Sequence, residues 1–241
     1  MGNVYLLKGL EEAQRSVRKN DITIAIDVIR CSSTIISGFQ NGVEQFIPLS
    51  SVKEVQDVIE RNPEYLSAGE RNGVKVSWFN FGNSPTELVS PSVKGKTVVI
   101  TTSNGAPLIH LGMTVSKRLL IGALINYQAC AKKAQELAIK SNSDVKILIP
   151  MTNRGECIED LYAAGLIAKS LYLEGFIPRW DSTKIGMLMA EIPTQRIIKE
   201  LRNSQSARRV KELGYKEDIS FSLKVDMTSL VPQSKNSSIR V

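Results

Sequence analysis

The chain has 241 residues, of which 42% are hydrophobic and 23% are charged, a balance typical of globular proteins with a large buried core. Its apolar runs all fall short of the roughly 18 residues that a membrane-spanning helix needs, and its N-terminus turns polar too soon for a signal peptide. We therefore expect a cytoplasmic protein that does not insert into membranes. The formal net charge of +7 suits an anionic ligand without identifying one.

The few cysteine and histidine residues exclude several kinds of site. Cys31, Cys130 and Cys157 are odd in number and far apart, so they form neither a disulfide framework nor a zinc-ligand spacing. His110 lies in an apolar stretch without a sequence partner for metal or triad chemistry. Any catalytic site should therefore be built from oxygen ligands and arginines.

Short apolar runs alternate with helical patterns along most of the chain. The apolar runs predict strands at residues 21–28, 44–49, 65–70, 97–102, 118–124 and 145–151. The amphipathic segments between them predict helices at residues 32–42, 51–62, 126–140 and 157–175. This alternation predicts an α/β fold, with a mostly parallel sheet flanked by helices on both faces.

The chain changes character beyond about residue 180. The pattern there predicts a helical C-terminal segment, and the tail from residue 229 is expected to be extended or disordered. Nine Lys or Arg residues lie between residues 179 and 216, most simply on a solvated basic helical face. We expect a single domain over residues 1–241; two intertwined α/β lobes, about 1–115 and 116–241, are the alternative that the pattern leaves open.

Ligand-type polar residues follow nearly every predicted strand. These residues occupy positions 27–34, 69–73, 101–105, 126 and 152–156, and a further group occupies positions 81–87. Ligands of open α/β sheets bind outside the carboxyl ends of the strands. The recurrence of such residues at these ends therefore predicts one shared ligand site.

Several of these turns are also predicted to begin helices. Ser84 can cap a helix, and either Ser32 or Ser33 can cap the helix that follows the predicted 21–28 strand. Asn104-Gly105 can open a helix directly after the TVVITT strand. An Asn-Gly pair is also typical of a hairpin, but the residues that follow do not alternate as a return strand would. Helix starts bind anions through free N–H groups and the helix dipole, although ordinary capping without a ligand is the alternative at each.

Two carboxylates end otherwise apolar predicted strands, Asp27 and Glu70. If they share a cleft they repel each other unless a cation lies between them, and oxygen-only ligands favour Mg²⁺. Glu159 and Asp160, in the first turn of the predicted 157–175 helix, could add a third ligand, although acids there also favour the helix dipole.

Three arginines, Arg30, Arg71 and Arg154, lie beside the same strand ends. A guanidinium group suits the oxygens of phosphate, carboxylate or sulfonate because it presents several N–H donors in one plane. The pattern predicts Mg²⁺, arginines and helix starts around a small polyanion.

Six sequence blocks, spread in order over roughly residues 3–233, resemble the 2-phosphosulfolactate phosphatase family. They are DVIRCSSTII, GERNGVKV, FGNSPTEL, TTSNGA, the IED of CIEDLYAAG, and LVPQ. Enzymes of this family depend on Mg²⁺ and belong to coenzyme M biosynthesis. The resemblance implies a phosphatase that hydrolyses a small phosphorylated polyanion, 2-phosphosulfolactate, to sulfolactate and phosphate.

The resemblance also implies roles for individual residues. It implies catalytic roles for Asp27, Arg30 and Glu70, and metal binding by Asp27, Glu70 and Asp160. Together with the strand-end argument, it gives as substrate-binding candidates Ser33, Arg71, Asn83, Ser84, Thr102, Ser103, Asn104, Gly105 and Arg154. The nucleophile is either a metal-bound water or Asp27 itself, through an acyl-phosphate.

Three positions depart from the family pattern. Asn80 stands where Asp is common, Ala106 where Thr is usual, and Cys31 where Ala is usual. Asn80 cannot be an anionic metal ligand, and Cys31 replaces an inert residue, so neither is assigned to the chemistry.

Two other functions stay open. One is a non-catalytic α/β protein that binds a small anion or a nucleotide, which would bind phosphorylated ligands without releasing phosphate. The other is nucleic-acid binding, which is not favoured because the basic segment offers only Trp180 and Tyr215 for stacking. A homodimer is a hypothesis for the assembly.

Overall fold

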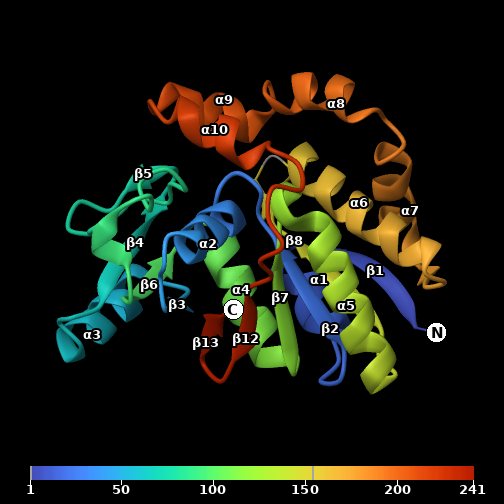
Figure 1. Ribbon diagram of the computed structural model, residues 1–241, viewed down its shortest axis with the longest axis horizontal. Coiled ribbons are helices and arrows are strands. Elements are labelled where there is room, and N and C mark those ends of the chain that lie inside the picture. The colour runs from blue at the N-terminus through green and yellow to red at the C-terminus, as the bar shows by residue number, and fades with distance from the viewer. Residues whose placement is uncertain (1, 154) are drawn as a thin grey trace.

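The runs of β-branched residues form the strands of one large sheet. The computed structural model, which describes residues 2–153 and 155–241, contains an eleven-stranded sheet in the order β11-β1-β8-β2-β7-β12-β13-β3-β6-β4-β5 (Figure 1). A separate two-stranded hairpin joins β9 (Met151–Thr152) to β10 (Gly155–Glu156). The large sheet consists of two mostly parallel halves with an antiparallel hairpin between them.

The first half of the sheet is entirely parallel. Its strands are β11 (Ile177–Pro178), β1 (Asn3–Lys8), β8 (Val145–Ile149), β2 (Ile22–Ile26) and β7 (Arg118–Gly122). Every residue of β2 and β8 is buried, as expected of parallel strands that helices cover on both faces.

The second half contains three parallel strands and a short antiparallel one. Its strands are β3 (Gln45–Pro48), β6 (Thr97–Thr101), β4 (Leu66–Arg71) and β5 (Val74–Lys75). In β4, Gly69 has a φ of +138°, and a Cβ atom there would collide with the carbonyl of Thr101 in the neighbouring strand.

The C-terminal tail joins the two halves. It forms a hairpin of β12 (Gln233–Lys235) and β13 (Ser238–Arg240), which pairs antiparallel with β7 on one side and with β3 on the other. Gln233 lies opposite Leu120 and the fully buried Ile239 lies opposite Phe46. Of the two states expected for the tail, the structure has the extended one, at the centre of the sheet.

The helices cover both faces of the sheet because side chains of successive strand residues point to opposite sides. In β1, Leu6 belongs to the core beneath α5 and α6, whereas Leu7 packs in a second core with Ala13 of α1 and Leu108 of α4. The helices are α1 (Gly9–Ser16), α2 (Cys31–Gln40), α3 (Val52–Arg61), α4 (Gly105–Val115), α5 (Tyr127–Ser141), α6 (Ile158–Leu173), α7 (Trp180–Met189), α8 (Thr194–Leu201), α9 (Gln205–Glu212) and α10 (Lys216–Ser222), with short 3₁₀ turns at Pro91–Val93 and Leu124–Asn126.

The predicted fold class is confirmed: the sheet is mostly parallel, helices lie on both faces, and the C-terminal segment is helical. Helices α8, α9 and α10 pass over one end of the sheet (Figure 1). A search of the described residues finds no helix with the length and hydropathy to span a bilayer.

Candidate active site

A cleft of about 560 Å³ lies at the carboxyl edge of the sheet, and both halves of the sheet contribute to it. Its lining includes loops that follow β2, β4, β6 and β8. The sequence-predicted residues that line it are Asp27, Arg30, Glu70, Asn83, Ser103, Asn104 and Asp160. A further part of the lining, which we call the α9 wall, comprises residues 203–206 and 208–210.

Asp27 is held at the end of the buried strand β2. Its side chain is 9% exposed, and its Oδ1 accepts a hydrogen bond from the Cys31 backbone N–H at 3.3 Å. Gly105 lies against Oδ2 so closely that a Cβ atom at that position would collide with it. Burial raises the pKa of Asp27 to about 7; the Cys31 hydrogen bond and the positive charge of Arg30 oppose this shift, and the negative charges of Glu70 and Glu159 add to it.

Two more buried carboxylates lie in the first turn of α6. Asp160 is 2% exposed, and its Oδ1 accepts a hydrogen bond from the Val28 N–H at 2.7 Å. Burial, with Glu159 and Asp27 nearby, raises the pKa of Asp160 well above its usual range. Three carboxylates therefore lie close enough to disfavour one another's ionised forms.

Glu159 is the least compensated of these acids. It is fully buried, and within the described part of the chain neither of its carboxylate oxygens has a hydrogen-bond partner. Burial raises its pKa, while the nearby Ser206 and Ser204 partly offset the shift. Those two hydroxyls form other hydrogen bonds, since Ser206 donates to Cys157 Sγ at 3.1 Å and Ser204 accepts from the Ala207 N–H at 3.2 Å.

Glu70 connects two of the loops that line the cleft. Its Oε2 accepts hydrogen bonds from the Gly73 N–H at 2.6 Å and the Ser103 hydroxyl at 3.0 Å, and its Oε1 accepts from the Ser103 N–H at 2.7 Å. The loop after β6 thus ends in small hydrogen-bonding residues because a buried acid from β4 holds it in place. Glu70 also lines the cleft, and its three accepted hydrogen bonds do not use all the acceptor capacity of the carboxylate.

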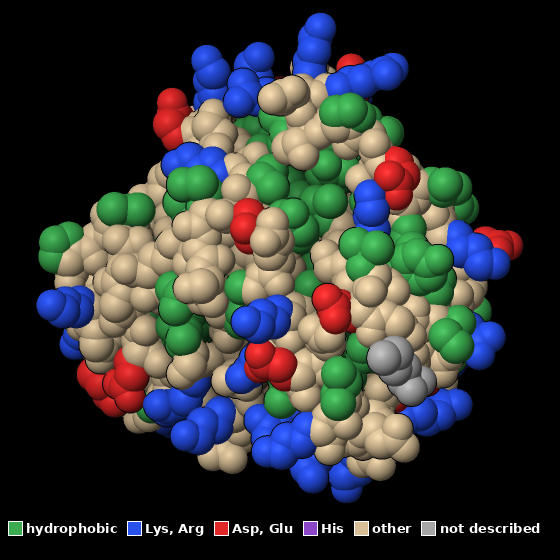
Figure 2. All heavy atoms as spheres, turned by 45° about the vertical axis from the view of Figure 1, so that its right-hand side comes forward, with side chains coloured by type: hydrophobic (Ala, Val, Ile, Leu, Met, Phe, Trp, Pro, Cys, Tyr) green, Lys and Arg blue, Asp and Glu red, His purple; other side chains and the backbone are tan. Residues whose placement is uncertain are grey.

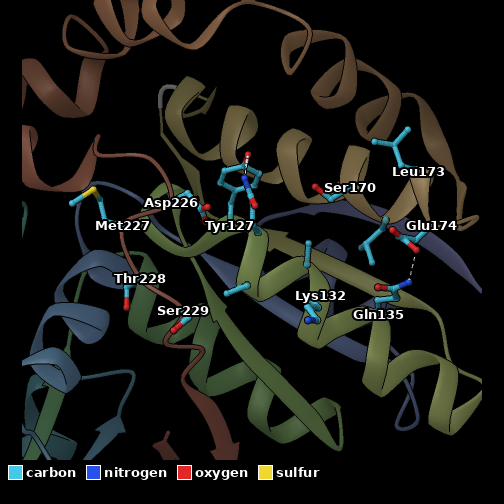
Figure 3. A pocket seen from close by; sticks show the side chains of 14 residues that line it. Tyr127, Lys132, Gln135, Ser170, Leu173, Glu174, Asp226, Met227, Thr228 and Ser229 are labelled. Atoms are coloured by element: carbon cyan, nitrogen blue, oxygen red, sulfur yellow. Dashed lines mark hydrogen bonds between the residues drawn. The ribbon is translucent and has the colours of Figure 1, made fainter.

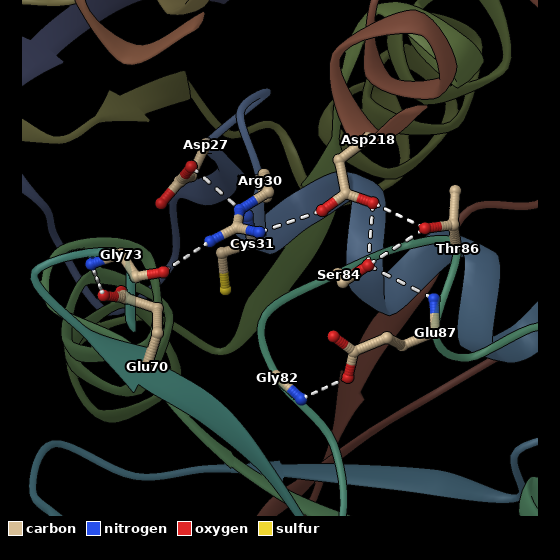
Figure 4. A network of polar contacts seen from close by, with 10 residues as sticks. All are labelled: Asp27, Arg30, Cys31, Glu70, Gly73, Gly82, Ser84, Thr86, Glu87 and Asp218. Atoms are coloured by element: carbon tan, nitrogen blue, oxygen red, sulfur yellow. Dashed lines mark hydrogen bonds and ion pairs between the residues drawn. The ribbon is translucent and has the colours of Figure 1, made fainter. Parts of the chain in front are cut away.

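Arg30 is fixed by a residue from the far end of the chain. Its Nη1 donates to Asp218 Oδ2 of α10 at 2.9 Å, and its Nη2 donates to the Gly73 carbonyl at 3.1 Å (Figure 4). Its guanidinium carbon lies 4.6 Å from the ring centroid of Tyr215. Arg30 and Asp218 are only 3% and 1% exposed, so their charges are paired out of contact with water.

Asp218 also connects α10 to the loop after Phe81. Its Oδ1 accepts hydrogen bonds from Ser84 Oγ and Thr86 Oγ1, each at 2.7 Å, and Figure 4 shows these hydroxyls on the side away from Arg30. The sequence does not mark Asp218 as a site residue. An acid in the first turn of a short helix is ordinary, and no local signal indicates a partner 188 positions earlier.

Four of the predicted substrate-binding residues are buried near the cleft without lining it. The Ser33 hydroxyl donates to the Val28 carbonyl at 2.8 Å, and Thr102 Oγ1 accepts from the Ala106 N–H at 2.8 Å. Ser84 is bound to Asp218, and Gly105 packs on Asp27. These positions support the cleft in the structure, and their contact with substrate stays a prediction.

Of the two other predicted arginines, Arg71 also lies outside the lining. Its guanidinium donates to the Glu70 carbonyl at 2.7 Å, to Thr101 Oγ1 at 2.9 Å and to the Ser50 carbonyl at 3.3 Å. Arg154 lies outside the described residues. Asn83 does line the cleft, is 5% exposed, and has a side-chain oxygen with no hydrogen-bond partner among the described residues.

Two local predictions about helix starts are wrong. The residues after Ser84 form a turn, with Ser84 Oγ accepting from the Glu87 N–H at 3.2 Å and the Glu87 carboxylate accepting from the Gly82 N–H at 2.6 Å. Helix α2 begins at Cys31, before the predicted caps, and Ser32 Oγ instead accepts from the Asp27 N–H at 3.0 Å. The helix predicted after Asn104 is present as α4, which begins at Gly105.

The residues that depart from the family pattern have structural contacts. Asn80 Oδ1 accepts from the Ser67 N–H at 2.8 Å and from its hydroxyl at 2.9 Å, away from the cleft lining. Burial raises the pKa of the Cys31 thiol well above its usual range, which leaves it protonated and a poor nucleophile.

The donors of the cleft fit a hard cation in their chemistry, although the described residues contain no ready cluster of three or more His, Cys, Asp or Glu side chains that could hold a metal ion. Asp27, Glu70 and Asp160 line one cleft and offer only oxygen atoms. Mg²⁺ commonly uses one or two carboxylates, waters and substrate phosphate, so it does not need a complete protein cage.

A larger hollow of about 820 Å³ lies elsewhere, where α5 and α6 face residues 226–229 (Figure 3). Its charged side chains are few and dispersed, and one of them, Glu174, accepts a hydrogen bond from Gln135 at 2.8 Å. None of the predicted site residues that the structure describes lines this hollow. The smaller cleft is therefore the candidate active site.

Comparison with known proteins gives a consistent result. Residues 9–237 match the family described as 2-phosphosulpholactate phosphatase. The chain is 31% identical over 239 residues to a protein of Clostridium tetani named "Probable 2-phosphosulfolactate phosphatase". The matched region covers 99% of this chain and 100% of that protein. Proteins with the same name from Caldanaerobacter subterraneus (31% identity, 95% of each chain) and Clostridium acetobutylicum (30% identity, 98% and 99%) are also similar.

Proposed function

Because the chain belongs to the 2-phosphosulpholactate phosphatase family, we propose that it hydrolyses the phosphomonoester of a small polyanionic 2-phospho acid, namely 2-phosphosulfolactate. The observation that carries the proposal is the meeting of Asp27, Glu70 and Asp160 with Arg30 in one cleft at the carboxyl edge of the sheet. These residues come from the loop after β2, the end of β4 and the start of α6.

The substrate requires both positive charge and careful positioning. Phosphosulfolactate carries a phosphate, a sulfonate and a carboxylate, and unaided monoester hydrolysis is slow enough that accelerations up to about 10²¹ are known. Arg30 has five N–H groups, and the bonds to Asp218 and Gly73 engage only part of them. The remaining N–H groups can donate to the phosphoryl oxygens, because the pairing with Asp218 holds the guanidinium in place.

We propose Mg²⁺ as the cofactor, held by Asp27, Glu70 and Asp160. The ion would supply the positive charge that offsets the negative charge of the phosphoryl oxygens. Asn104, at the start of α4, would also bind the anion, since it lines the cleft, whereas the N–H and the hydroxyl of Ser103 are engaged by Glu70.

Asp27 either attacks phosphorus, forming an acyl-phosphate that water then hydrolyses, or assists a water that attacks directly. Single-turnover hydrolysis of a substrate with a chiral phosphate in labelled water distinguishes the two routes. Direct attack by water inverts the configuration at phosphorus and places the water oxygen in the phosphate. The acyl-phosphate route either retains the configuration, when water attacks the phosphorus of the intermediate, or leaves the water oxygen on Asp27, when water attacks the carboxyl carbon.

The proposal is tested by phosphate release from a panel of 2-phospho acids, with and without EDTA. We expect turnover of 2-phosphosulfolactate that EDTA abolishes and added Mg²⁺ restores. Asp27→Asn and Glu70→Gln should each lose most of the activity. Tight binding of phosphorylated ligands without any phosphate release would instead support the non-catalytic alternative.

Two coarser proposals concern where and how the protein works. We place the reaction in the cytoplasm, which cell fractionation tests. The homodimer stays a prediction, and sedimentation equilibrium of the purified protein decides it.

A further inference from the structure

The α9 wall is the part of the cleft to which the proposed function assigns no role. Helix α9 is fixed in orientation because Ala207 and Val210 are buried in the main core. Arg208 and Arg209, between these two positions, are exposed at the cleft. Lys and Arg side chains gather at this end of the molecule, over the region where Figure 1 places α8 and α9 (Figure 2).

Three arginines are among the described residues that line the cleft, and two of them already have partners. Arg30 is paired with Asp218 at 2.9 Å. Arg209 donates to the Asn72 carbonyl at 3.3 Å, and its Nη1 lies 3.9 Å from Glu212 Oε2. Arg208 forms neither a side-chain hydrogen bond nor an ion pair with any residue that the structure describes. It is the uncommitted cation of the described lining.

The acids of the cleft make such a cation necessary for a polyanionic substrate. Asp27, Glu70, Asp160 and Glu156 line the same space. A cation bound among them can accommodate the phosphate, but a second acid group on the same small molecule would be repelled by the remaining negative charge. A guanidinium group offers paired N–H donors that match a carboxylate or a sulfonate.

We propose that Arg208 binds the second anionic group of the substrate, a carboxylate or a sulfonate, and so selects phosphorylated polyanions over simple phosphomonoesters. The inference rests on the proposed function, since it assumes that the cleft binds a 2-phospho acid. It assigns to the α9 wall the recognition of the part of the substrate that does not react.

The main experiment compares kcat/KM for three substrates in the wild type and in Arg208→Ala. The substrates are 2-phosphosulfolactate, 2-phospholactate, which lacks the sulfonate, and isopropyl phosphate, which lacks both acid groups. We expect Arg208→Ala to lower kcat/KM for 2-phosphosulfolactate by about ten- to a hundredfold, mainly through KM, the range of one charge-assisted hydrogen-bonded contact. The loss should shrink to about threefold or less for isopropyl phosphate.

The intermediate substrate identifies the group that is bound. If 2-phospholactate shows the full loss, Arg208 binds the carboxylate, and if it behaves like isopropyl phosphate, Arg208 binds the sulfonate. Arg208→Lys should recover part of the loss, because a lysine retains the charge without the paired donors. An equal loss for all three substrates, or no loss for any, overturns the proposal.

The control is Arg202→Ala, which removes the same charge from the same basic segment. Arg202 is exposed and lies outside the cleft lining, so this variant reports the long-range effect of charge alone. If Arg202→Ala matches Arg208→Ala on 2-phosphosulfolactate, the effect is general attraction and the proposal is wrong.

Direct binding separates this inference from the proposed function. Calorimetry should show that Arg208→Ala weakens the binding of sulfolactate about tenfold or more while changing the binding of inorganic phosphate little. This outcome supports the role of Arg208 even if the wild type releases no phosphate from any substrate. Unchanged sulfolactate affinity in the variant rules that role out, whether or not the protein is a phosphatase.

Discussion

The strand-end loops and the α9 wall face the same cleft but are built in opposite ways. The strand ends contribute acids that are almost fully buried, among them Asp27 and Glu70, and hydrogen bonds from backbone N–H groups hold them in place. The α9 wall contributes exposed arginines on a helix anchored by two small apolar contacts. The difference fits the two proposals made above, in which the buried side performs the reaction and the exposed side recognises the part of the substrate that does not react.

Among the variants of the buried side, Asp27→Asn should cause the largest loss of activity. We expect kcat to fall by at least about a thousandfold, since the carboxylate is both a proposed metal ligand and a candidate nucleophile. At pH 8 the same change should stabilise the metal-free protein, because it removes a buried charge. At about 1.4 kcal/mol per pKa unit, the free energy of unfolding should rise by an order of a few kcal/mol. Chemical denaturation in EDTA measures the stability. A variant that is both inactive and less stable would indicate a structural role instead.

Asp218 of α10 pairs with Arg30 of the buried side, and its loss should have the next largest effect. Asp218→Ala leaves the buried Arg30 without its counter-charge, for which we expect a loss of about 3–5 kcal/mol in the free energy of unfolding and a clear fall in kcat. A double-mutant cycle with Arg30→Ala isolates the pair. If the two losses simply add, Arg30 and Asp218 do not act as a unit.

The pH dependence of stability should differ with and without Mg²⁺. The pKa of Asp27 is raised from 3.8 to about 7 by folding, so the native state retains a proton that the unfolded state has lost. In EDTA, stability should therefore fall as the pH rises from about 4 to about 7, and Asp160, whose pKa is also raised, acts in the same direction. In the proposed site Mg²⁺ would bind the ionised carboxylates, so the shift in Tm that it causes should grow over that range. Asp27→Asn should reduce this growth, and a Tm shift independent of pH would contradict the assignment.

Arg209→Ala should have the smallest effect. Its ion pair with Glu212 is exposed, with side-chain exposures of 53% and 68%, and such pairs contribute about 0–1 kcal/mol. We expect a stability change within that range and a change of only a few fold in KM, through the loss of the contact with the Asn72 carbonyl. Thermal denaturation and steady-state kinetics measure the two. A loss as large as that expected for Arg208→Ala would mean that the two arginines share one role.

Local signals in the sequence were sufficient for the buried side of the site. Asp27 and Glu70 stand out because each ends an apolar strand, and Asn104-Gly105 indicates a helix start because no return strand follows. The parallel arrangement of the strands then brings their carboxyl ends to one edge, which is why the residues that line the cleft could be predicted.

The other side of the site could not be predicted, because its contacts join segments far apart in the chain. Asp218 acquires its importance only when α10 packs over Arg30, and Arg208 becomes distinctive only when its neighbours are seen to be paired. The pattern around Ser84 predicts a helix because a hydrogen bond from the Glu87 N–H to the Ser84 hydroxyl is typical of a capped helix. The same hydrogen bond is present in the observed turn, which the bond from Ser84 to Asp218 holds in place. The tail has no recognisable strand pattern because each of its two strands has only three residues. Its strands form by pairing with β7 and β3, which lie far away in the chain.

The β12–β13 hairpin has a consequence for how the protein is made. It follows every other strand of the sheet in the chain, yet it occupies the gap between β7 and β3. A nascent or truncated chain that ends before residue 233 would therefore present two unpaired inner edges, which are prone to join strands of neighbouring molecules. Removal of this short segment would separate the two halves of the sheet and expose strand edges, so we expect the intact tail to protect the chain from aggregation.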